Sequence, residues 1–517
     1  MRFPLPMCFQ SANHTAAVSK PSTVVQPPRY RLPGRRARAV ARLLRARSSL
    51  MMVTAMISAV SSNAWANAGV RGPEIAFTSP NGAKELCVAL DPMPGGQYTE
   101  PDRAKEAEFC SVDFYGSTHA LCPKVFSTSP GTLVYQVTGD SAAFERGSCG
   151  GGIRKHGAIG DPISYKMSVN TPQTSATFAN SSLIYYHFSR YFRTTAHIPV
   201  AVFRSMDRKI HEERVSARGV ELSAGKPALK MNHAAWLALQ AAEQEPGSYK
   251  PASELFTPDG LIYGVMLHPA GKRYNEEING TRESGWGDGQ NEDFQQTAPF
   301  LALRSEAPLD AAIEEGKRLA QRNPKLARAI GADATPQQMV AWMSDLVDIT
   351  LLDFIFSQQD RVGNVDYLPY WYWVDDGAIQ SQPAHSLTPP TELTNFKPVH
   401  IKRTELGDND AGVRLTYTNY TKRTGMLEKL RHYRADTYRL LMQLESDFQS
   451  RGPLHEYVRT TFGISQREFE QVVANTTAAA SILRDSCKAG RLRFDIDRDE
   501  FLLTGTVTPG KVSCELP

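Results

Sequence analysis

Apolar residues follow a helical period most clearly between residues 335 and 356. Thr335, Pro336 and Gln338 form a helix start, with a threonine cap, a proline at the first helical position and a glutamine three residues after the cap. The apolar side chains that follow form one continuous stripe and predict a long helix: Met339, Met343, Leu346, Val347, Leu351, Phe354 and Ile355. A polar loop, Asp-Arg-Val-Gly-Asn at residues 360–364, follows directly, and the aromatic segment at residues 367–374 is typical of a strand.

Weaker patterns predict the remaining elements. Helices are expected at residues 180–192, from 309 onward, at 426–448 and from 465, where Ser465 and Glu468 form a capping box. Strands are expected at residues 132–138, 163–169, 198–203 and 399–402. Residues 67–130 show little helical periodicity and predict a loop-rich region. Residues 271–296 are polar and glycine-bearing, and their length predicts an insertion or a lid rather than a packed element.

The order of these elements predicts an α+β fold with two lobes. We expect a leader at residues 1–66, a cysteine-bearing subdomain at residues 67–130 and a main domain at residues 131–517. Within the main domain, the smaller lobe is expected at about residues 131–267, the insertion at about 271–300 and the helical lobe at about 305–517. A hydrophobic content of 41% and a charged content of 22% are those of a globular chain and exclude a disordered one.

The first 66 residues have the composition of an export signal. A basic region at residues 35–47 precedes a largely apolar run at residues 50–60, and Ala64-Trp65-Ala66 fits the small-x-small rule of signal peptidase. Because the apolar run is too short to span a bilayer comfortably, we expect an exported protein, periplasmic or secreted, without a permanent membrane span after cleavage. The long stretch ahead of the run leaves an over-extended start, an unusual leader, or a basic tail on a cytosolic protein as alternatives.

The same segment decides the net charge of the chain. The formal charge is +4, from 58 basic and 54 acidic residues. Ten of the basic residues, nine arginines and Lys20, lie in the first 66 residues, which hold no acidic residue. The rest of the chain has 48 basic residues against 54 acidic ones, a balance of −6. A body of that charge gives no electrostatic reason to expect nucleic-acid binding.

Cysteine usage agrees with export. Apart from Cys8 in the leader, the chain has an even number of cysteines: Cys87, Cys110, Cys122, Cys149, Cys487 and Cys514. They form no CxxC pair and no zinc-like spacing, so three disulfides made in an oxidising compartment are the simplest interpretation. We expect Cys487 and Cys514 to pair, which stabilises the fold by ~3 kcal/mol in the chain-entropy model. The pairing of the other four stays open, and six free thiols in a cytosolic protein are the alternative.

Two candidate features point to a nucleotide. Phosphoryl transfer needs positioning and charge neutralisation more than covalent chemistry. The glycine-rich stretch at residues 147–160, which includes Gly157 and Gly160, could bring backbone N–H groups close to phosphates. Lys166, on the strand predicted beyond it, could reach the same phosphates. The alternatives are a flexible hairpin loop for the glycines and a surface lysine on an edge strand.

Two further features could supply a base and metal ligands. Asp360 and Asn364 begin and end the polar loop, and Asp408 follows the strand at residues 399–402 in the run Gly-Asp-Asn-Asp-Ala-Gly. Mg²⁺ prefers one or two such carboxylates together with phosphate oxygens. The alternatives are a capped turn with an Asp–Arg pair and an Asx-rich turn. Motifs of other chemistries, HExxH, GxSxG, GxxxxGK[ST] and GxGxxG, are absent from the sequence.

The run from residue 353 to residue 364, followed by a strand and Asp408-Asn409, resembles the atypical kinase superfamily. The branches concerned are the secretory-pathway kinases related to four-jointed and to the Golgi casein kinase, the HipA-type kinases and the phosphatidylinositol 3-/4-kinases. The predicted helix at residues 180–192 and the strand after it are similar to the first-lobe helix and strand of these proteins. The resemblance covers residues from about 132 to 414, and only the two short loops are distinctive.

The resemblance implies a two-lobed protein-kinase-like fold with a disulfide-bearing N-terminal extension. It implies ATP with Mg²⁺ or Mn²⁺ as cofactors, and a protein, sugar or lipid hydroxyl as acceptor. It makes Asp360 the catalytic base, Lys166 the nucleotide lysine, with Gly157 and Gly160 over the phosphates, and it makes metal ligands of two residues, Asn364 and Asp408.

The chain departs from the family pattern in two places. Asn364 stands four positions after Asp360, where the family usually has five, so Asp366 is a second candidate. No acidic residue lies between Lys166 and Asp207, so the glutamate that usually pairs with the lysine is missing from the first-lobe helix. Glu212 or Glu213 could substitute. The sequence therefore predicts an exported phosphotransferase, with two alternatives. One is a catalytically inactive member of the fold that acts as a binding or scaffold protein. The other is an unrelated envelope protein that holds a glycan or peptide with the aromatic strand, including Trp371 and Trp373, and the mobile loop at residues 271–296.

Overall fold

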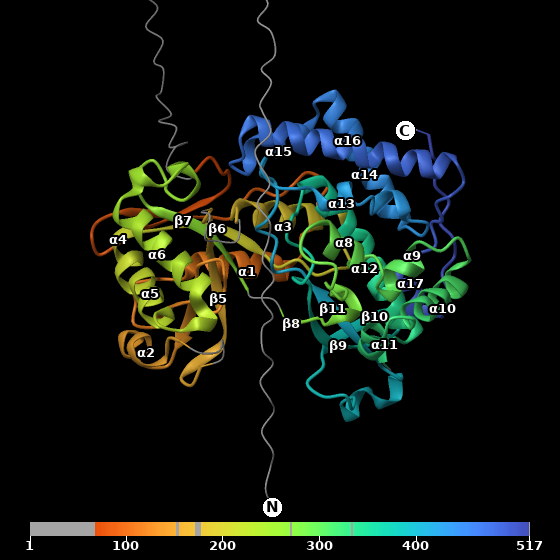
Figure 1. Ribbon diagram of the computed structural model, residues 1–517, viewed down its shortest axis with the longest axis horizontal. Coiled ribbons are helices and arrows are strands. Elements are labelled where there is room, and N and C mark those ends of the chain that lie inside the picture. The colour runs from red at the N-terminus through yellow and green to blue at the C-terminus, as the bar shows by residue number, and fades with distance from the viewer. Residues whose placement is uncertain (1–67, 151–154, 171–176, 269–270, 332–333, 516–517) are drawn as a thin grey trace, which may run out of the picture. The chain divides into compact units, whose positions relative to one another are not determined.

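The computed structural model describes residues 68–150, 155–170, 177–268, 271–331 and 334–515. It shows a mixed α+β fold in which the strands form antiparallel sheets (Figure 1). The predicted leader and Cys8 lie outside the described residues, as do residues 151–154 of the glycine-rich stretch.

The larger sheet has seven strands in the order β1-β2-β6-β7-β5-β4-β3, and every neighbouring pair is antiparallel. Their bounds are β1 Glu74–Thr78, β2 Lys84–Val88, β3 His119–Pro123, β4 Gly131–Val137, β5 Ala158–Met167, β6 Ala201–Met206 and β7 Ile262–Leu267. The strands predicted at residues 132–138 and 163–169 are confirmed as β4 and β5. The strand predicted at residues 198–203 begins three residues later than expected.

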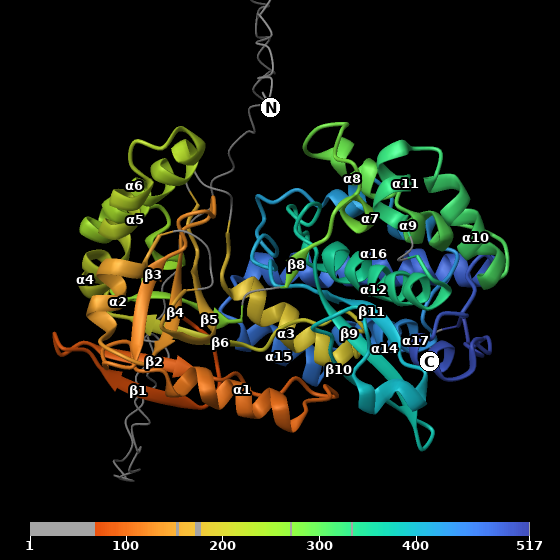
Figure 2. The same cartoon turned by 90° about the horizontal axis from the view of Figure 1, so that it is seen from below.

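Six helices accompany this sheet: α1 Glu100–Ser111, α2 Ser141–Ser148, α3 Asn180–Phe192, α4 Arg208–His211, α5 Ala217–Ser223 and α6 Lys230–Gln244. Helices α1 and α3 contact β6, and α5 contacts β3 (Figure 2). The predicted helix at residues 180–192 is confirmed with the same bounds. Residues 67–130, expected to be loop-rich, hold the regular elements β1, β2, α1 and β3 between their loops. Helix α1 escaped detection because it is polar and short of apolar periodicity, although Thr99 and Asp102 form its capping box.

A smaller sheet contains β9 Asp366–Asp375 between β10 Ala378–Pro383 and β11 Val399–Glu405, with the short strand β8 Lys272–Arg273 also paired to β9. The predicted strands at residues 367–374 and 399–402 are therefore confirmed. Tyr372 of β9 and Ile401 of β11 pack on Ala341, which attaches this sheet to the long helix α12 Pro336–Phe356.

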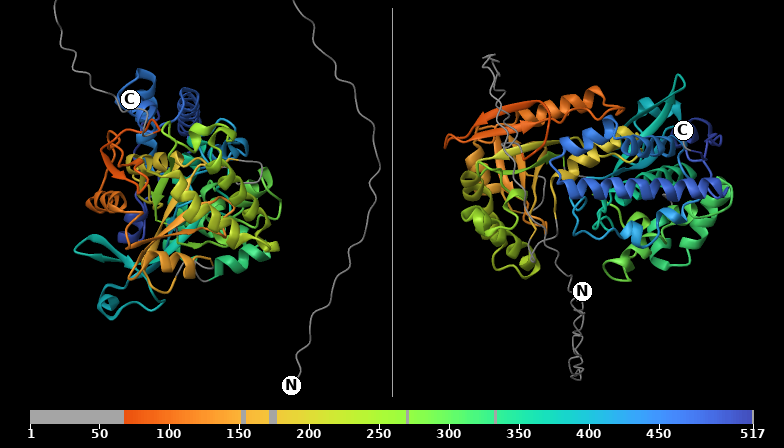
Figure 3. Two further views of the ribbon diagram at one scale, coloured as in Figure 1. Left: turned by 90° about the vertical axis from the view of Figure 1, so that its left-hand side faces the viewer. Right: turned by 90° about the horizontal axis from the view of Figure 1, so that it is seen from above.

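The C-terminal half of the chain is largely helical. Besides α12, its helices include α7 Glu276–Asn279, α8 Asp288–Phe294, α9 Ala298–Leu303, α10 Leu309–Ala320, α11 Pro324–Ile330, α13 Tyr420–Arg423, α14 Ala435–Ser450, α15 Pro453–Thr461, α16 Gln466–Lys488 and α17 Arg498–Thr504. Of these, α9, α10, α13, α16 and α17 contact α12. Helix α16 packs against α12 and α14 (Figure 3). The predicted caps are present: the Gln338 N–H donates to Thr335 Oγ1 at 3.2 Å, and Ser465 and Glu468 form the capping box of α16.

The expectation of a long unpacked loop at residues 271–296 is wrong. This segment contains β8, α7 and α8, and it buries Tyr274, Ile278 and Phe294 in the core. Its apolar residues are few and widely spaced, so the sequence shows no periodicity. The three named side chains nevertheless pack in the core and hold the segment in place. Segments of this kind are held by a few buried side chains rather than by a continuous apolar face.

Three disulfides join the six cysteines outside the leader: Cys87–Cys110, Cys122–Cys149 and Cys487–Cys514. The predicted pairing of Cys487 with Cys514 is confirmed. The other two bridges tie β2 to α1 and β3 to the end of α2. Within the described part of the chain, no helix combines the length and apolar character needed to cross a membrane.

Candidate functional site

Lys166 lies near the end of β5, in the interior of the seven-stranded sheet. Its strand neighbours are Gly131 of β4 and Val265 of β7. Because side chains alternate along a strand, Tyr165 and Lys166 point to opposite faces: Tyr165 contacts the ring of Phe114, while Lys166 extends toward residues 407–410. The lysine predicted as a nucleotide ligand is thus buried in the interior, not on an edge strand.

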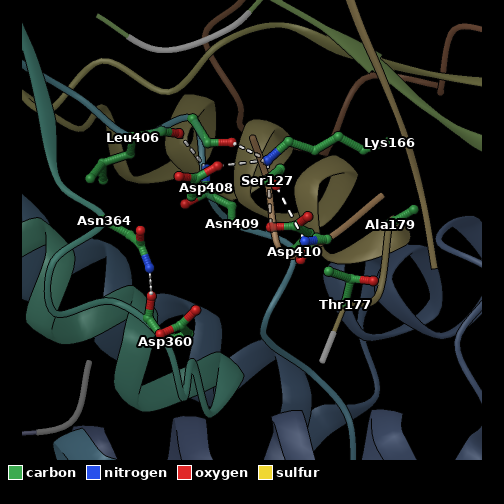
Figure 4. A network of polar contacts seen from close by, with 12 residues as sticks. Ser127, Lys166, Thr177, Ala179, Asp360, Asn364, Leu406, Asp408, Asn409 and Asp410 are labelled. Carbon is green, nitrogen blue, oxygen red and sulfur yellow. Dashed lines mark hydrogen bonds and ion pairs between the residues drawn. The ribbon is translucent and has the colours of Figure 1, made fainter. Parts of the chain in front are cut away.

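The segment after β11 meets Lys166. The Lys166 ammonium donates to Asp408 Oδ1 at 2.9 Å and to the Gly407 carbonyl at 3.1 Å, and Asp410 Oδ1 lies 3.5 Å away (Figure 4). Burial alone would lower the pKa of Lys166, but the two carboxylates outweigh it and hold that pKa above its usual value. Burial would likewise raise the pKa of Asp408, yet Lys166 first, then Lys124 and Arg273, hold it well below its usual range. Both groups are therefore charged at neutral pH.

The polar loop follows α12 in a fixed conformation. Ser357 ends the helix in the left-handed region, with φ of 53°. The buried side chain of Asn279, on α7, accepts from the Gly363 N–H at 3.0 Å and the Val365 N–H at 3.3 Å. Asn364 then folds back, and its Nδ2 donates to the Asp360 carbonyl at 2.7 Å (Figure 4). Asn279 comes from the segment expected to be an insertion or lid, and it braces the loop instead.

Arg361 is buried in the core. Its guanidinium forms two hydrogen bonds to Asp353, at 2.9 and 3.0 Å, and the hydroxyl of Tyr185 on α3 donates to the same carboxylate at 2.7 Å. Arg361 also donates to Asn409 Oδ1 at 2.8 Å and to the Asp408 carbonyl at 3.2 Å. The arginine of the loop thus joins α12, α3 and the segment that carries Asp408.

Asp360, Asn364, Lys166 and Asp408 line one cleft of about 300 Å³. Gly157 and Gly160 do not line it. An extended strand rises about 3.3 Å per residue, so Gly160 lies about 20 Å along β5 from Lys166. The turn between β3 and β4 takes part in the cleft instead, with Lys124, Ser127 and Gly131 among its lining residues.

Three carboxylates and three cations line the cleft: Asp360, Asp408, Asp410, Lys124, Lys166 and Arg273. Asp366 lies next to it, paired with Arg273. Burial, together with the charges of Asp410 and Asp408, raises the pKa of Asp360 to about 6. Burial also raises the pKa of Asp366 to about 6, against the opposing effect of Arg273. The pKa of Lys124 is lowered, chiefly by burial. An acid with a pKa close to neutrality is typical of a group that exchanges protons during a reaction.

Asp408 and Asn364, the two residues expected to bind a divalent cation, both accept hydrogen bonds from the guanidinium of Arg273. Asp408 Oδ2 accepts from Arg273 Nη2 at 3.1 Å, and Asn364 Oδ1 accepts from Nη1 of the same guanidinium. A carboxylate and an amide oxygen suit Mg²⁺ or Mn²⁺ in their chemistry. Among the described residues, no three His, Cys, Asp or Glu side chains form a metal-binding group on their own. The donor set fits such an ion only with Arg273 moved away.

The sequence missed two cations of the cleft. Arg273 belongs to the segment expected to be a loop, and Lys124 belongs to a region expected to lack regular structure. The pairing of β8 with β9 places Arg273 opposite Asp366. A strand of two residues is too short to be predicted from a local sequence pattern. A turn of Lys-Val-Phe-Ser-Thr-Ser-Pro-Gly between two strands, one strand before Lys166, was the only signal for Lys124.

The aromatic strand contributes to packing. Trp371 is 5% exposed and packs with Ala384 and Leu393, and its ring centroid lies 5.1 Å from that of His400. Trp373 is partly buried against the same cluster. These contacts give both tryptophans a structural role in the smaller sheet.

Compared with protein-family models and with curated proteins, the chain matches none.

Proposed function

We propose that the protein is an exported phosphotransferase with a two-lobed, protein-kinase-like fold. It transfers a phosphoryl group from ATP, with Mg²⁺ or Mn²⁺, to a hydroxyl of a protein, sugar or lipid. One observation carries the proposal: Lys166, Asp360 and Asp408, which are far apart in the sequence, line the same cleft. The lysine, the loop aspartate and the metal-binding carboxylate are the charged parts that phosphoryl transfer uses.

The placement of Lys166 supports the kinase-like fold. In protein kinases the phosphate-binding lysine lies on the third strand, and a loop between the preceding strands covers the phosphates. Counted from β3, Lys166 lies on the third strand, β5, and the turn at residues 124–130 lies between the first two. The helix α3 follows β5, as the first-lobe helix would. The turn offers Lys124 and Ser127 to phosphates in place of the glycines predicted for that role.

Each residue has a distinct part in the proposed reaction. Lys166 and Lys124 bind phosphate oxygens through their ammonium groups. Asp360 accepts the proton of the acceptor hydroxyl, and its raised pKa places the change between its two protonation states close to neutral pH. Asp408 and Asn364 would hold the divalent cation, which supplies positive charge to the phosphates when bound.

Export is part of the proposal because of the cysteines and the leader. All six cysteines outside the leader are paired, as expected for an oxidising compartment. The apolar run at residues 50–60 and Ala64-Trp65-Ala66 supply a signal for it. Free ATP is scarce in a bacterial periplasm, whereas a secretory lumen, or delivery into another cell, would provide the nucleotide.

A catalytically inactive binding protein of the same fold is the second candidate. Helix α3 has no acidic residue, so Lys166 pairs with Asp408 and Asp410 rather than with a helix glutamate. This candidate predicts nucleotide binding without turnover, or no metal-dependent binding.

Incubation of the purified protein with γ-labelled ATP and Mg²⁺ or Mn²⁺ tests the proposal. We expect label to move to an acceptor, to the protein itself or to water. Asp360→Ala and Asp408→Ala should each abolish the transfer while the circular dichroism spectrum stays that of a folded protein. Transfer that persists in both variants would refute the assignment of this cleft.

A further inference from the structure

Arg273 reaches the cleft through an unusually close approach of two backbones. Strand β8 pairs with β9 so that Arg273 lies opposite Asp366. At Gly271, just before β8, an added Cβ atom would lie 2.1 Å from the Tyr367 carbonyl oxygen. Only glycine allows that approach, and the approach fixes where the arginine side chain begins.

The guanidinium of Arg273 contacts four oxygen-bearing groups. Its Nε forms an ion pair with Asp366 Oδ1 at 2.5 Å, and its Nη2 donates to Asp408 Oδ2 at 3.1 Å. Its Nη1 donates to the Gly363 carbonyl and to Asn364 Oδ1. The two side chains that would hold a divalent cation are therefore bridged by one protein cation.

Asp408 has no carboxylate oxygen left over in this arrangement. Its Oδ1 accepts from Lys166 at 2.9 Å, and its Oδ2 accepts from Arg273. A guanidinium and a divalent ion seek the same anionic oxygens and repel each other, so both cannot occupy the position between Asp408 and Asn364. The Arg273 side chain is 44% exposed, which leaves it a path outward into solvent.

We propose that Arg273 and a divalent cation compete for Asp408 Oδ2 and Asn364 Oδ1, so that Arg273 sets the metal affinity of the cleft. The proposal rests on the metal site of the proposed function. It adds that Arg273 neutralises the site through these contacts, and that metal binds only when this side chain moves away.

Titration of Mn²⁺ into the protein without nucleotide, followed by the electron paramagnetic resonance signal of free Mn²⁺, tests the competition. We expect Arg273→Gln to bind Mn²⁺ about tenfold or more tightly than the wild type, since the cation that competes for Asp408 Oδ2 and Asn364 Oδ1 is removed. Arg273→Lys keeps the charge without the bridging geometry and should fall between the two. Arg403→Gln is the matched control: Arg403 lies on β11, pairs with Glu405 at 2.8 Å and should leave the affinity unchanged.

Affinity that is equal in Arg273→Gln, Arg403→Gln and the wild type would overturn the proposal, as would the absence of any Mn²⁺ binding in Arg273→Gln. If Arg273→Gln does not fold, as judged by circular dichroism, Arg273→Lys decides, and an affinity equal to that of the wild type would overturn it. Since no nucleotide is present, this result is independent of whether the protein transfers phosphate. Tighter Mn²⁺ binding without phosphoryl transfer would support the competition and refute only the proposed reaction.

Discussion

Two clusters of charged side chains lie on either side of the loop at residues 360–364, and they differ in burial and in how fully their charges are paired. The inner cluster, Arg361 with Asp353, is 4% and 2% exposed and has a hydrogen-bond partner for each charge. The outer cluster, Lys166 with Asp408 and Arg273, lines an open cleft, where the carboxylates of Asp360, Asp408 and Asp410 lie close enough to repel one another. One loop therefore carries a structural residue and two candidate functional residues side by side. A buried, satisfied pair fixes geometry, whereas a crowded and partly exposed set retains the capacity to bind.

Removal of the inner arginine should have the largest effect on stability. Arg361→Met leaves the buried Asp353 carboxylate with only the Tyr185 hydroxyl as a partner. Breaking a buried pair by removing one member costs about 3–5 kcal/mol, and we expect the free energy of unfolding in urea to fall by that amount. Arg459→Gln, which removes an exposed arginine paired with Glu456, serves as the control and should leave the unfolding curve in place. Equal curves for the two variants would mean that Arg361 is not a structural residue.

Removal of the outer lysine should act on ligand binding instead. We expect Lys166→Met to weaken ATP binding by about 2–3 kcal/mol, as for the loss of a charged hydrogen bond, which is a factor of about 30 to 150 in the dissociation constant. Isothermal titration calorimetry measures the dissociation constant of ATP for both proteins. Lys272→Met removes an exposed lysine of β8 next to Arg273 and should bind ATP as the wild type does. An equal loss of ATP affinity in both variants would mean that the loss of any nearby positive charge weakens binding, and that Lys166 is not a specific ATP ligand.

The pH dependence of stability separates Asp360 from ordinary surface carboxylates. The folded-state pKa of Asp360 is raised to about 6, so its contribution to stability is fully present below the unfolded value of about 4 and is lost as the pH rises through about 6. Asp360→Asn should therefore come close to the wild type at pH 4 and exceed it by on the order of 2–3 kcal/mol at pH 7. Chemical denaturation at both values checks this. Asp375→Asn, at the exposed end of β9, should show no such difference, and a pH-independent gap for Asp360→Asn would contradict the raised pKa.

The glycines predicted to cover phosphates should matter least. Gly160 has φ of 67°, so Gly160→Ala places a side chain in the left-handed region and should cost about 1–2 kcal/mol of stability. ATP affinity should not change, because this position is remote from Lys166. A loss of affinity beyond the error of the calorimetric titration would restore Gly160 to the nucleotide site.

The sequence was most informative where a local pattern is strong and continuous. The stripe and caps of α12, the helix α3 and the strands β4, β5, β9 and β11 could all be predicted, and Lys166, Asp360, Asn364 and Asp408 do meet in one cleft. The predictions failed where packing depends on isolated anchors, as in the segment that holds Tyr274, Asn279 and Phe294. They also failed for contacts made across the sequence, since the bridge from Arg273 to Asp408 follows from strand pairing and not from any motif. The inward direction of Arg361 belongs to the same class, because adjacent residues in a loop can face opposite ways.

The most direct test of the central claim is a thermal-unfolding titration of the purified protein with ATP and Mg²⁺ or Mn²⁺, with Asp408→Ala beside it. A ligand at about 100 times its dissociation constant adds ~2.7 kcal/mol of apparent stability. The account predicts a metal-dependent rise of the unfolding temperature in the wild type that is absent in Asp408→Ala. No shift with either metal, or an equal shift in both proteins, would contradict a nucleotide site at Lys166 and Asp408.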